Sequence, residues 1–326
     1  MQRKLAGETV NGFGLGCMNL SHAYGVPPTP EAGREVLAKA LDLGVDHFDT
    51  AALYGFGRNE TLVGEALKGV RQRIFLASKC GLTNETGARV MDGRPETLRL
   101  TCEASLRRLQ TDVIDLYYLH RWDKSVPIEE SVGGLAELLR EGKIRSIGLS
   151  EVSAATLKKA HAEHPIAAVQ TEYSLWTRNP EIAVLEACRD IGVAFVAFSP
   201  LGRGFLGGAV RDGNFAPRDL RATMPRFMAE NLAQNLTWFA EFEYLANSAA
   251  VTPAQLALAW VMSRGDHVHV IPGTTSIEHL TENMTVPELD ASLLAEAGEL
   301  INIYAVKGAR YPATIQPEID TEEFAP

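Results

Sequence analysis

Short runs of β-forming residues alternate with helical stretches along almost the whole chain, and this alternation restricts the fold more than any other feature. Eight runs have the character of strands: 14–18, 46–50, 74–79, 115–120, 144–149, 167–171, 194–199 and 268–271. Helical patterns cover 31–43, 59–69, 95–109, 128–141, 153–162, 180–190 and 252–264. Such alternation is typical of βα units around a parallel sheet. Eight units favour a closed (β/α)8 TIM barrel over an open doubly wound sheet, whose change of strand order a sequence cannot show.

The length of 326 residues suits such a barrel as one unit, so we predict a single domain over 1–326. Residues 1–13 precede the first strand and are expected to form a hairpin that caps the floor of the barrel. Two long loops follow strands, at 81–93 and 201–230. Long loops at the carboxyl ends of strands are usually functional, and we expect both to cover a site. Residues 308–326 are expected to form either a third cover over the site or a flexible tail.

Composition narrows the class of partner. With 46% hydrophobic and 22% charged residues and no apolar run near the ~20 residues of a membrane helix, the sequence predicts a cytoplasmic protein without a membrane partner. A formal charge of −10 argues against nucleic acid as a partner. Four widely spaced cysteines without a C-x-x-C pair fit reduced thiols better than disulfides or a zinc site. A small molecule is the predicted partner, and no metal is expected. The oligomeric state is not visible.

Four residues of different chemistry lie at or just past the ends of three successive predicted strands. Asp49 and Tyr54 flank the end of the second strand, Lys79 closes the third and His120 closes the fourth. Catalytic residues of (β/α)8 barrels gather at this end of the strands, so we predict that the four side chains converge. Each alone is more simply explained as a packed or solvated residue. Their combination indicates an active site.

The chemistry of these four residues favours proton transfer to or from a carbonyl oxygen. A phenol with a pKa near 10 is a weak acid at neutral pH, but a nearby ammonium such as that of Lys79 stabilises its phenolate. Asp49 can keep Lys79 charged, and His120 can orient a carbonyl oxygen toward Tyr54. The sequence lacks the H-E-x-x-H motif of a metal-dependent hydrolase. A Schiff-base aldolase that uses Lys79 is a further alternative, but it needs a neutral lysine, which Asp49 opposes.

Further motifs are spread through nearly the whole chain. They are Gly14-Leu15-Gly16-Cys17-Met18, Phe48-Asp49-Thr50-Ala51 with Tyr54-Gly55, Asn59-Glu60, Gly64, Ser78-Lys79, His120, Gly148-Leu149-Ser150, Gln170, Ser199-Pro200-Leu201-Gly202 and Ile271-Pro272-Gly273. In this order they resemble those of the aldo-keto reductases, most of all the bacterial and fungal branch with pyridoxal reductase-like members. The resemblance implies NAD(P)H-dependent hydride transfer to a carbonyl, with Tyr54 as general acid, Lys79 and Asp49 tuning it, and His120 orienting the substrate.

The resemblance also implies cofactor contacts. Ser150 and Gln170 match positions that hold the nicotinamide carboxamide, and Glu151 stands where relatives have Asn, yet it can still accept from the amide. Phe198 matches the ring that stacks on the nicotinamide. Arg203 is implied as a charge partner of the pyrophosphate. The other implied contacts are Met18, Ser199, Pro200, Leu201, Gly202, Ile271, Gly273, Thr274, Thr275, Ser276, His279, Glu282 and Asn283.

The segment after the eighth strand departs from the family. Relatives usually place Lys or Arg there to bind the 2′-phosphate of NADPH, whereas this chain offers Thr274, Thr275, Ser276 and His279. Hydroxyls and the N–H groups of a helix start can hold a phosphate, but they lack the charge of a guanidinium fork. The resemblance therefore implies NADPH as cofactor, with NADH also usable and weaker discrimination than in relatives.

Aromatic and sulfur-containing side chains just past the strands are expected to form the substrate pocket. They are Met18, Tyr24, Trp122, Trp176 and Phe205, with Tyr311 a further candidate. Such walls suit flat or apolar compounds, and no basic cluster in the sequence marks a phosphate or carboxylate, so a small or aromatic aldehyde or ketone is the predicted substrate. The alternative is a non-catalytic nicotinamide-binding subunit that senses redox state for a partner, as in some members of the superfamily beside ion channels.

Overall fold

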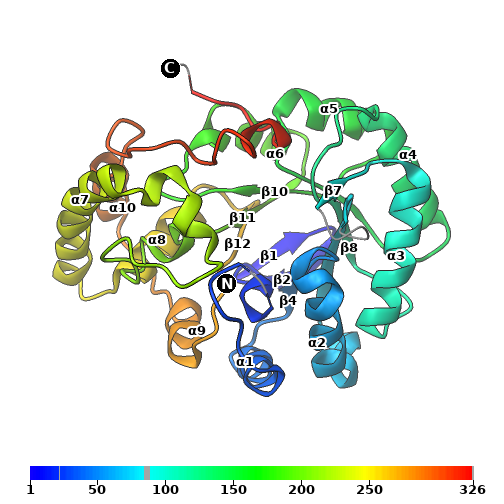
Figure 1. Cartoon of the computed structure of the whole chain (residues 1–326), viewed down its shortest axis with the longest axis horizontal. Helices are drawn as coiled ribbons and strands as arrows, with labels where there is room; N and C mark the ends of the chain where they lie inside the picture. The colour runs from blue at the N-terminus through cyan, green and yellow to red at the C-terminus, as the bar shows by residue number, and fades with distance from the viewer. Residues whose placement is uncertain (22, 84–88, 325–326) are drawn as a thin grey trace.

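The computed structural model describes residues 1–21, 23–83 and 89–324, and eight parallel strands form its centre (Figure 1). These strands are β3 (Leu15–Gly16), β4 (His47–Asp49), β5 (Phe75–Cys80), β8 (Leu116–Leu119), β9 (Ile147–Ser150), β10 (Ala168–Glu172), β11 (Ala194–Phe198) and β12 (Val268–Ile271). Each pairs with its neighbour in chain order, and a parallel bridge between Phe13 and Val270 joins the two ends of the sheet. The predicted (β/α)8 barrel is confirmed.

Seven helices occupy the predicted helical stretches to within a few residues. They are α1 (Pro30–Asp42), α2 (Arg58–Leu67), α3 (Pro95–Leu109), α4 (Ile128–Arg140), α5 (Ala154–Glu163), α6 (Val184–Asp190) and α8 (Pro253–Met262). The start signals of several are visible in the structure. Thr29 caps α1 ahead of Pro30, and Thr252 and Gln255 form a reciprocal capping box on α8.

Three helices were not predicted: α7 (Ala229–Ser248), α9 (Ile277–Met284) and α10 (Ala291–Leu300). The sequence of α7 mixes strong helix formers such as Ala, Leu and Glu with Asn, Thr and aromatic residues that favour helices only weakly, and tertiary packing adds to its stability. Its buried side chains Trp238, Phe239 and Phe242 lie in the main hydrophobic core. Within the described residues, no helix combines the length and the apolar character that a bilayer crossing requires.

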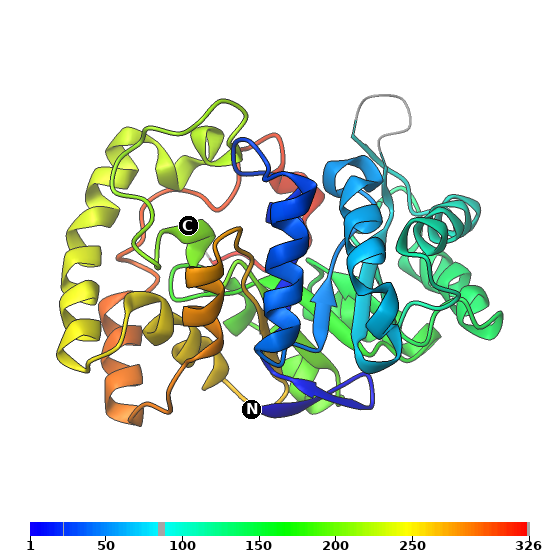
Figure 2. The same cartoon turned by 90° about the horizontal axis from the view of Figure 1, so that it is seen from below.

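The N-terminal segment closes one end of the barrel. Strands β1 (Gln2–Leu5) and β2 (Glu8–Asn11) pair antiparallel and form the hairpin expected for residues 1–13, at the lower end of the barrel in Figure 2. Leu5 and Val10 are buried together with the inward-facing strand residues Tyr118 and Val196. The hairpin therefore covers this end of the barrel, and a ligand is expected to enter from the opposite end.

The long loops lie at that opposite end (Figure 2). The segment 81–93 contains β6 (Leu82–Thr83) and β7 (Val90–Met91), and its residues 84–88 lie outside the described residues. Short 3-10 helices occur throughout the chain: η1 (Met18–Leu20), η2 (Tyr54–Gly57), η3 (Lys68–Arg73), η4 (Asn179–Glu181), η5 (Gly202–Gly204), η6 (Leu220–Thr223), η7 (Pro225–Phe227) and η8 (Gln316–Glu318).

Residues 308–324 of the tail lie against the barrel. Lys124 donates from Nζ to the carbonyls of Pro317 and Ile319 at 3.0 and 3.1 Å, and the N–H of Asp320 donates to the carbonyl of Glu151 at 2.8 Å. Residues 325 and 326 of the predicted cover lie outside the described residues. The tail thereby becomes part of the wall above the strand ends.

Two helix-interior glycines provide a test of how tightly the outer layer packs. A Cβ on Gly64 of α2 would lie 2.5 Å from the carbonyl oxygen of Arg108 in α3, whereas a Cβ on Gly133 of α4 would meet nothing within 4 Å. We expect Gly64→Ala to destabilise the fold by about 1–3 kcal/mol through overpacking. Gly133→Ala should stabilise it by about 0.5–1 kcal/mol through helix propensity. Urea unfolding of both variants checks this, and equal shifts would contradict the packing argument.

Candidate active site

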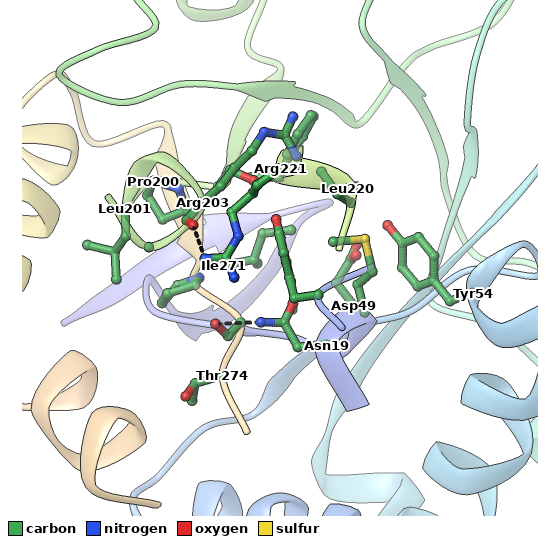
Figure 3. Close-up of a pocket in the computed structure, with 18 of the residues that line it drawn as sticks. Asn19, Asp49, Tyr54, Pro200, Leu201, Arg203, Leu220, Arg221, Ile271 and Thr274 are labelled. Atoms are coloured by element: carbon green, nitrogen blue, oxygen red, sulfur yellow. Dashed lines mark hydrogen bonds between the residues drawn. The ribbon is translucent and has the colours of Figure 1, made fainter. Parts of the chain in front are cut away.

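A cavity of about 770 Å³ opens at the carboxyl ends of the strands, beneath the long loops (Figure 3). This volume lies within the range of small-molecule and cofactor sites. The predicted catalytic residues Asp49, Tyr54 and His120 line it, and Lys79 lies directly beneath them. The sheet explains why they meet, since β4, β5 and β8 are consecutive neighbours that bring Asp49 and Lys79 into adjacent strands.

Lys79 is held by an ion pair inside the barrel. Lys79 is 1% exposed. Its Nζ donates a hydrogen bond to Asp49 Oδ1 and another, at 2.8 Å, to the carbonyl of Thr50. Gln170 from β10 donates to the second carboxylate oxygen of Asp49 at 2.7 Å. Burial acts to lower the pKa of Lys79, but Asp49 and Tyr54 outweigh it and raise that pKa above its usual value. The ammonium is therefore charged at neutral pH.

The phenol of Tyr54 lies over this ammonium. The ring centroid of Tyr54 is 5.0 Å from Lys79 Nζ, and its ring meets that of His120 edge to face at 5.7 Å between centroids. Burial raises the pKa of Tyr54 above its ordinary value, while the charge of Lys79 and a hydrogen bond from it act in the opposite direction. At neutral pH the phenol keeps its proton, and Lys79 stabilises the phenolate once that proton is given away.

The backbone after β4 aims Tyr54 into the cavity. Gly55 and Gly57 adopt left-handed conformations, with φ of 56° and 86°, and the chain turns there from the strand end into α2. Asn59 fixes the turn: its Oδ1 accepts from the Thr50 hydroxyl at 2.6 Å, and its Nδ2 donates to the carbonyl of Cys17 at 2.8 Å. The sequence pointed to Asn59 only as part of a motif, whereas the structure shows it holding the loop that carries Tyr54.

Most residues implied as cofactor contacts line the same cavity. They are Met18, Ser150, Gln170, Phe198, Ser199, Pro200, Leu201, Arg203, Ile271, Gly273, Thr274, Thr275, His279, Glu282 and Asn283. Figure 3 shows Tyr54 and Asp49 on one side of the space, with Leu201 and Thr274 on the other. The cavity thus extends from the four catalytic candidates to the start of α9.

Three implied cofactor residues lie outside the cavity lining. Both carboxylate oxygens of Glu151 are engaged away from it, by Arg310, by the Thr321 hydroxyl at 2.7 Å and by the N–H of Glu172 at 3.0 Å. The expectation that Glu151 accepts from a carboxamide is therefore corrected, because its acceptor capacity is already used.

Gly202 and Ser276 have structural tasks instead. A Cβ on Gly202 would lie 2.9 Å from the indole nitrogen of Trp176, so the residue permits a close approach of the backbone to that ring. The hydroxyl of Ser276 accepts from the N–H of His279 at 3.2 Å and caps α9. Neither residue lines the cavity.

The predicted substrate pocket needs a larger correction. Met18, Tyr24 and Tyr311 line the cavity. Trp176 and Phe205 instead stack on each other, 4.5 Å between ring centroids, in the hydrophobic core at 2% and 0% exposure. They are core residues because α7 covers them with Trp238 and Phe239.

Trp122 also lies outside the cavity lining, and its indole N–H donates to the carbonyl of Val126 at 2.9 Å. A position just past a strand end therefore did not suffice to place these aromatic rings in the pocket.

We expected no cluster of basic residues at the site, and this expectation is wrong, because the fold brings basic side chains together in the cavity. Four arginines line the cavity: Arg89, Arg121, Arg203 and Arg221. Arg203 pairs with Glu172 and Arg221 with Asp219, each at 2.7 Å. Asn19 also lines the cavity and donates to the carbonyl of Gly273 at 3.2 Å (Figure 3). Arg203 and Arg221 come from the loop 201–230, whereas Arg89 and Arg121 come from other segments, and of the four the sequence had indicated only Arg203.

A pair of histidines in H-x-H spacing, His267 and His269, lies at the floor of the barrel, away from the cavity. Their Nε2 atoms lie 3.1 and 3.0 Å from the carbonyl oxygens of Leu185 and Lys4. Within residues 1–21, 23–83 and 89–324, no group of three or more His, Cys, Asp or Glu side chains is arranged to hold a metal ion.

Comparisons with known proteins agree with this geometry. Residues 13–301 match the Aldo/keto reductase family. The chain is 45% identical over 309 residues to a protein named probable aldo-keto reductase 1 from Glycine max, covering 94% of this chain and 89% of that protein. It is 42% identical over 320 residues to a protein of Schizosaccharomyces pombe named aldo-keto reductase yakc, whose name also specifies NADP(+). The match covers 95% of this chain and 94% of that protein.

Solved structures show the same relationship. A glycerol dehydrogenase from Gluconobacter oxydans superposes with a TM-score of 0.84 at 29% identity, covering 92% of this chain and 94% of that one. An aldo/keto reductase from Klebsiella pneumoniae, described in complex with NADP and acetate, has a TM-score of 0.72 at 28% identity, with coverage of 95% and 98%.

The buried carboxylate of Glu172 makes stability depend on pH in a defined direction. Burial acts to raise its pKa, but Arg203 and Arg310 lower it to about 2. Because the pKa is below that of an unfolded glutamate, the contribution is complete above about pH 4.5 and is lost as the pH falls toward 2. We expect Glu172→Gln to destabilise the protein at pH 7, on the order of 3 kcal/mol, and the difference from wild type to shrink below pH 4.5.

Urea unfolding at pH 7, 5, 4 and 3 measures this difference. Glu186→Gln is the matched control, since Glu186 lies on the surface of α6 with a side chain 70% exposed and pairs only with Arg189 there. That variant should follow the wild-type pH profile. Parallel profiles for wild type and Glu172→Gln would rule out the proposed linkage.

Proposed function

The chain belongs to the aldo-keto reductase family and is an oxidoreductase of carbonyls or alcohols, and on this premise we propose that it reduces an aldehyde or ketone with NAD(P)H, with Tyr54 as the general acid. The observation that carries the proposal is the phenol of Tyr54 set over the buried, charged ammonium of Lys79 at the edge of a large cavity. A protonated phenol beside a fixed positive charge suits proton donation to a developing alkoxide.

The residues divide the proton chemistry among them. Tyr54 gives its proton to the carbonyl oxygen as the C–O bond becomes single, and Lys79 stabilises the phenolate that remains. Asp49 keeps Lys79 charged and in place, and Gln170 in turn holds Asp49. His120, edge to face with Tyr54, is positioned to donate to the same oxygen and to orient the carbonyl.

The cavity has the donor set that a nicotinamide dinucleotide requires. Near Tyr54 the hydroxyl of Ser150 can hold a carboxamide, and Phe198 offers a ring surface. At the far end, the hydroxyls of Thr274 and Thr275 lie beside the capped start of α9, where backbone N–H groups favour a phosphate. When bound, the reduced nicotinamide supplies the hydride to the carbonyl carbon.

The residues that we expect near the 2′-phosphate of NADPH offer little positive charge to bind it. Thr274, Thr275 and His279 line the cavity there without a lysine or an arginine, and Glu282 places a carboxylate on the same surface. We therefore include NADH beside NADPH as a usable cofactor.

The aldolase alternative receives no support from the geometry. A Schiff-base lysine must be neutral to attack a carbonyl, whereas Lys79 is paired with Asp49 and its pKa is raised. A redox-sensing subunit remains distinguishable by experiment, since it would bind the cofactor tightly and turn over carbonyls only slowly.

The hydroxyl of Tyr54 can be removed without loss of the ring. Tyr54→Phe keeps the ring and its contact with His120 but removes the proton donor, so kcat for 4-nitrobenzaldehyde reduction should fall by about 100-fold or more. NADPH affinity, measured by quenching of tryptophan fluorescence, should be unchanged. Tyr244→Phe, at a surface tyrosine 77% exposed, is the control and should retain full activity. Full activity of Tyr54→Phe would exclude this residue as the general acid.

The missing basic residues near the start of α9 should weaken the choice between NADPH and NADH. Titration of the protein with NADPH and with NADH should give saturable binding of both, with affinities that differ by less than about three orders of magnitude, because no charge-assisted fork meets the 2′-phosphate. Introducing a guanidinium by Thr275→Arg should raise the preference for NADPH. A wild-type preference beyond that limit would mean that hydroxyls and N–H groups suffice here.

A further inference from the structure

Arg121 is a buried cation that makes no direct contact with a carboxylate of the described residues. The residue is 8% exposed and follows His120 directly at the end of β8. Its Nη1 donates to the carbonyl of His120 at 2.6 Å and to the hydroxyl of Ser150 at 3.2 Å. Its buried Nε has no hydrogen-bond partner among the described residues. A buried guanidinium with unused donors is costly unless an anion meets it.

The other arginines of the cavity differ from Arg121 in this respect. Arg89, Arg203 and Arg221 each form an ion pair, at 2.5, 2.7 and 2.7 Å. Across the part of the chain that the structure describes, no carboxylate lies within 4.0 Å of Arg121 in an ion pair. Of these four arginines, Arg121 alone lacks a direct ion pair with a described carboxylate, although its charge and that of Glu151 attract each other at longer range.

The nearby carboxylates are already committed to other partners. Both oxygens of Glu151 bond Arg310, and one of them also accepts from Thr321. Glu172 accepts from Arg203 and from Thr177 at 2.7 and 3.0 Å. Among residues 1–21, 23–83 and 89–324, these carboxylates therefore leave no acidic oxygen in hydrogen-bond contact with the Arg121 guanidinium.

A second guanidinium lies near Arg121. Arg89 comes from the loop after β6 and lines the same cavity. Burial lowers the pKa of Arg89, Glu318 opposes this shift, and Arg121 lowers that pKa further. The two guanidinium groups repel each other although Glu318 pairs with Arg89, and carboxylates and phosphates match the planar donor edge of an arginine.

We propose that Arg121, assisted by Arg89, binds an anionic group of the substrate, so that the preferred substrates are aldehydes or ketones that also carry a carboxylate or a phosphate. The proposal rests on the carbonyl reduction proposed above and assigns its substrate class. Arg121 adjoins His120 and Ser150, so the anion subsite lies at the end of the cavity where the carbonyl reacts. Arg203 and Arg221, beside Pro200 and Leu201, lie at the other end (Figure 3).

The test compares two substrates that differ in charge and by one methyl group, 4-carboxybenzaldehyde and methyl 4-formylbenzoate. The wild-type enzyme should show a kcat/KM at least tenfold higher for the acid than for the ester. Arg121→Met should bring this ratio near one, because it lowers kcat/KM for the acid more than for the ester; Arg121→Lys should keep part of the ratio, and Arg89→Gln should reduce it several-fold. The ratio is internal to each variant, so a partial loss of folded protein does not affect it.

A matched control is Arg71→Met. Arg71 is also largely buried, with a side chain 14% exposed, but pairs with Asp115 and bonds the carbonyls of Ile74 and Val113, away from the cavity. Its loss should lower stability and leave the acid-to-ester ratio as in wild type. Sodium phosphate should inhibit reduction of the ester competitively in wild type but not in Arg121→Met, which tests the phosphate arm.

Binding without turnover separates this proposal from the proposed function. The alcohols 4-(hydroxymethyl)benzoate and methyl 4-(hydroxymethyl)benzoate can be titrated against wild type and Arg121→Met by calorimetry, and only the wild type should prefer the acid. If wild type reduces neither aldehyde yet binds the acid selectively, the function fails and the anion subsite stands. Equal binding of acid and ester, an equal effect of Arg121→Met on both, or an effect confined to NADPH affinity would each overturn the anion subsite.

Discussion

The ion pair between Lys79 and Asp49 is the constraint on which the catalytic end of the barrel depends. An ammonium buried to this extent survives only if a carboxylate and further acceptors surround it, because desolvation otherwise favours the neutral amine. Asp49 and Lys79 lie in the adjacent strands β4 and β5, and Gln170 from β10 holds the second oxygen of Asp49. The order of the strands therefore also determines the geometry of the site. The acidity of the Tyr54 phenol depends on the positive charge of Lys79 beneath its ring.

A second buried network connects the carboxyl ends of the strands to the loops above them. Glu151 and Glu172, at the ends of β9 and β10, bind Arg310 of the tail, and Glu172 also binds Arg203 of the loop after β11. Tyr311 lies under the guanidinium of Arg203, whose central carbon is 5.4 Å from the centroid of the Tyr311 ring. Segments far apart in the chain thus meet through opposite charges that water does not screen. The wall of the cavity is consequently built largely from loops and the tail, whereas its floor is built from strands.

The sequence predicted the barrel and the four catalytic candidates because both depend on local patterns. Short apolar runs between capped helices mark βα units, and a polar residue at the end of such a run marks the active end of a barrel strand. Prediction failed for Trp176 and Phe205, which pack beneath α7, and for Glu151, whose carboxylate Arg310 engages from 159 residues away in the chain. Each failure involves a partner that is distant in sequence.

The sequence by itself determined the fold class, the strand ends and the types of chemical group placed there, since these follow from hydrophobic periodicity and from positions next to strand ends. The tertiary structure alone decided which charges are balanced. A net charge of −10 gives no sign that four arginines gather in one cavity, or that Arg121 among them lacks a direct ion-pair partner in the described chain. Charge balance depends on distances between atoms, and only the closed barrel with its loops and tail in place sets those distances.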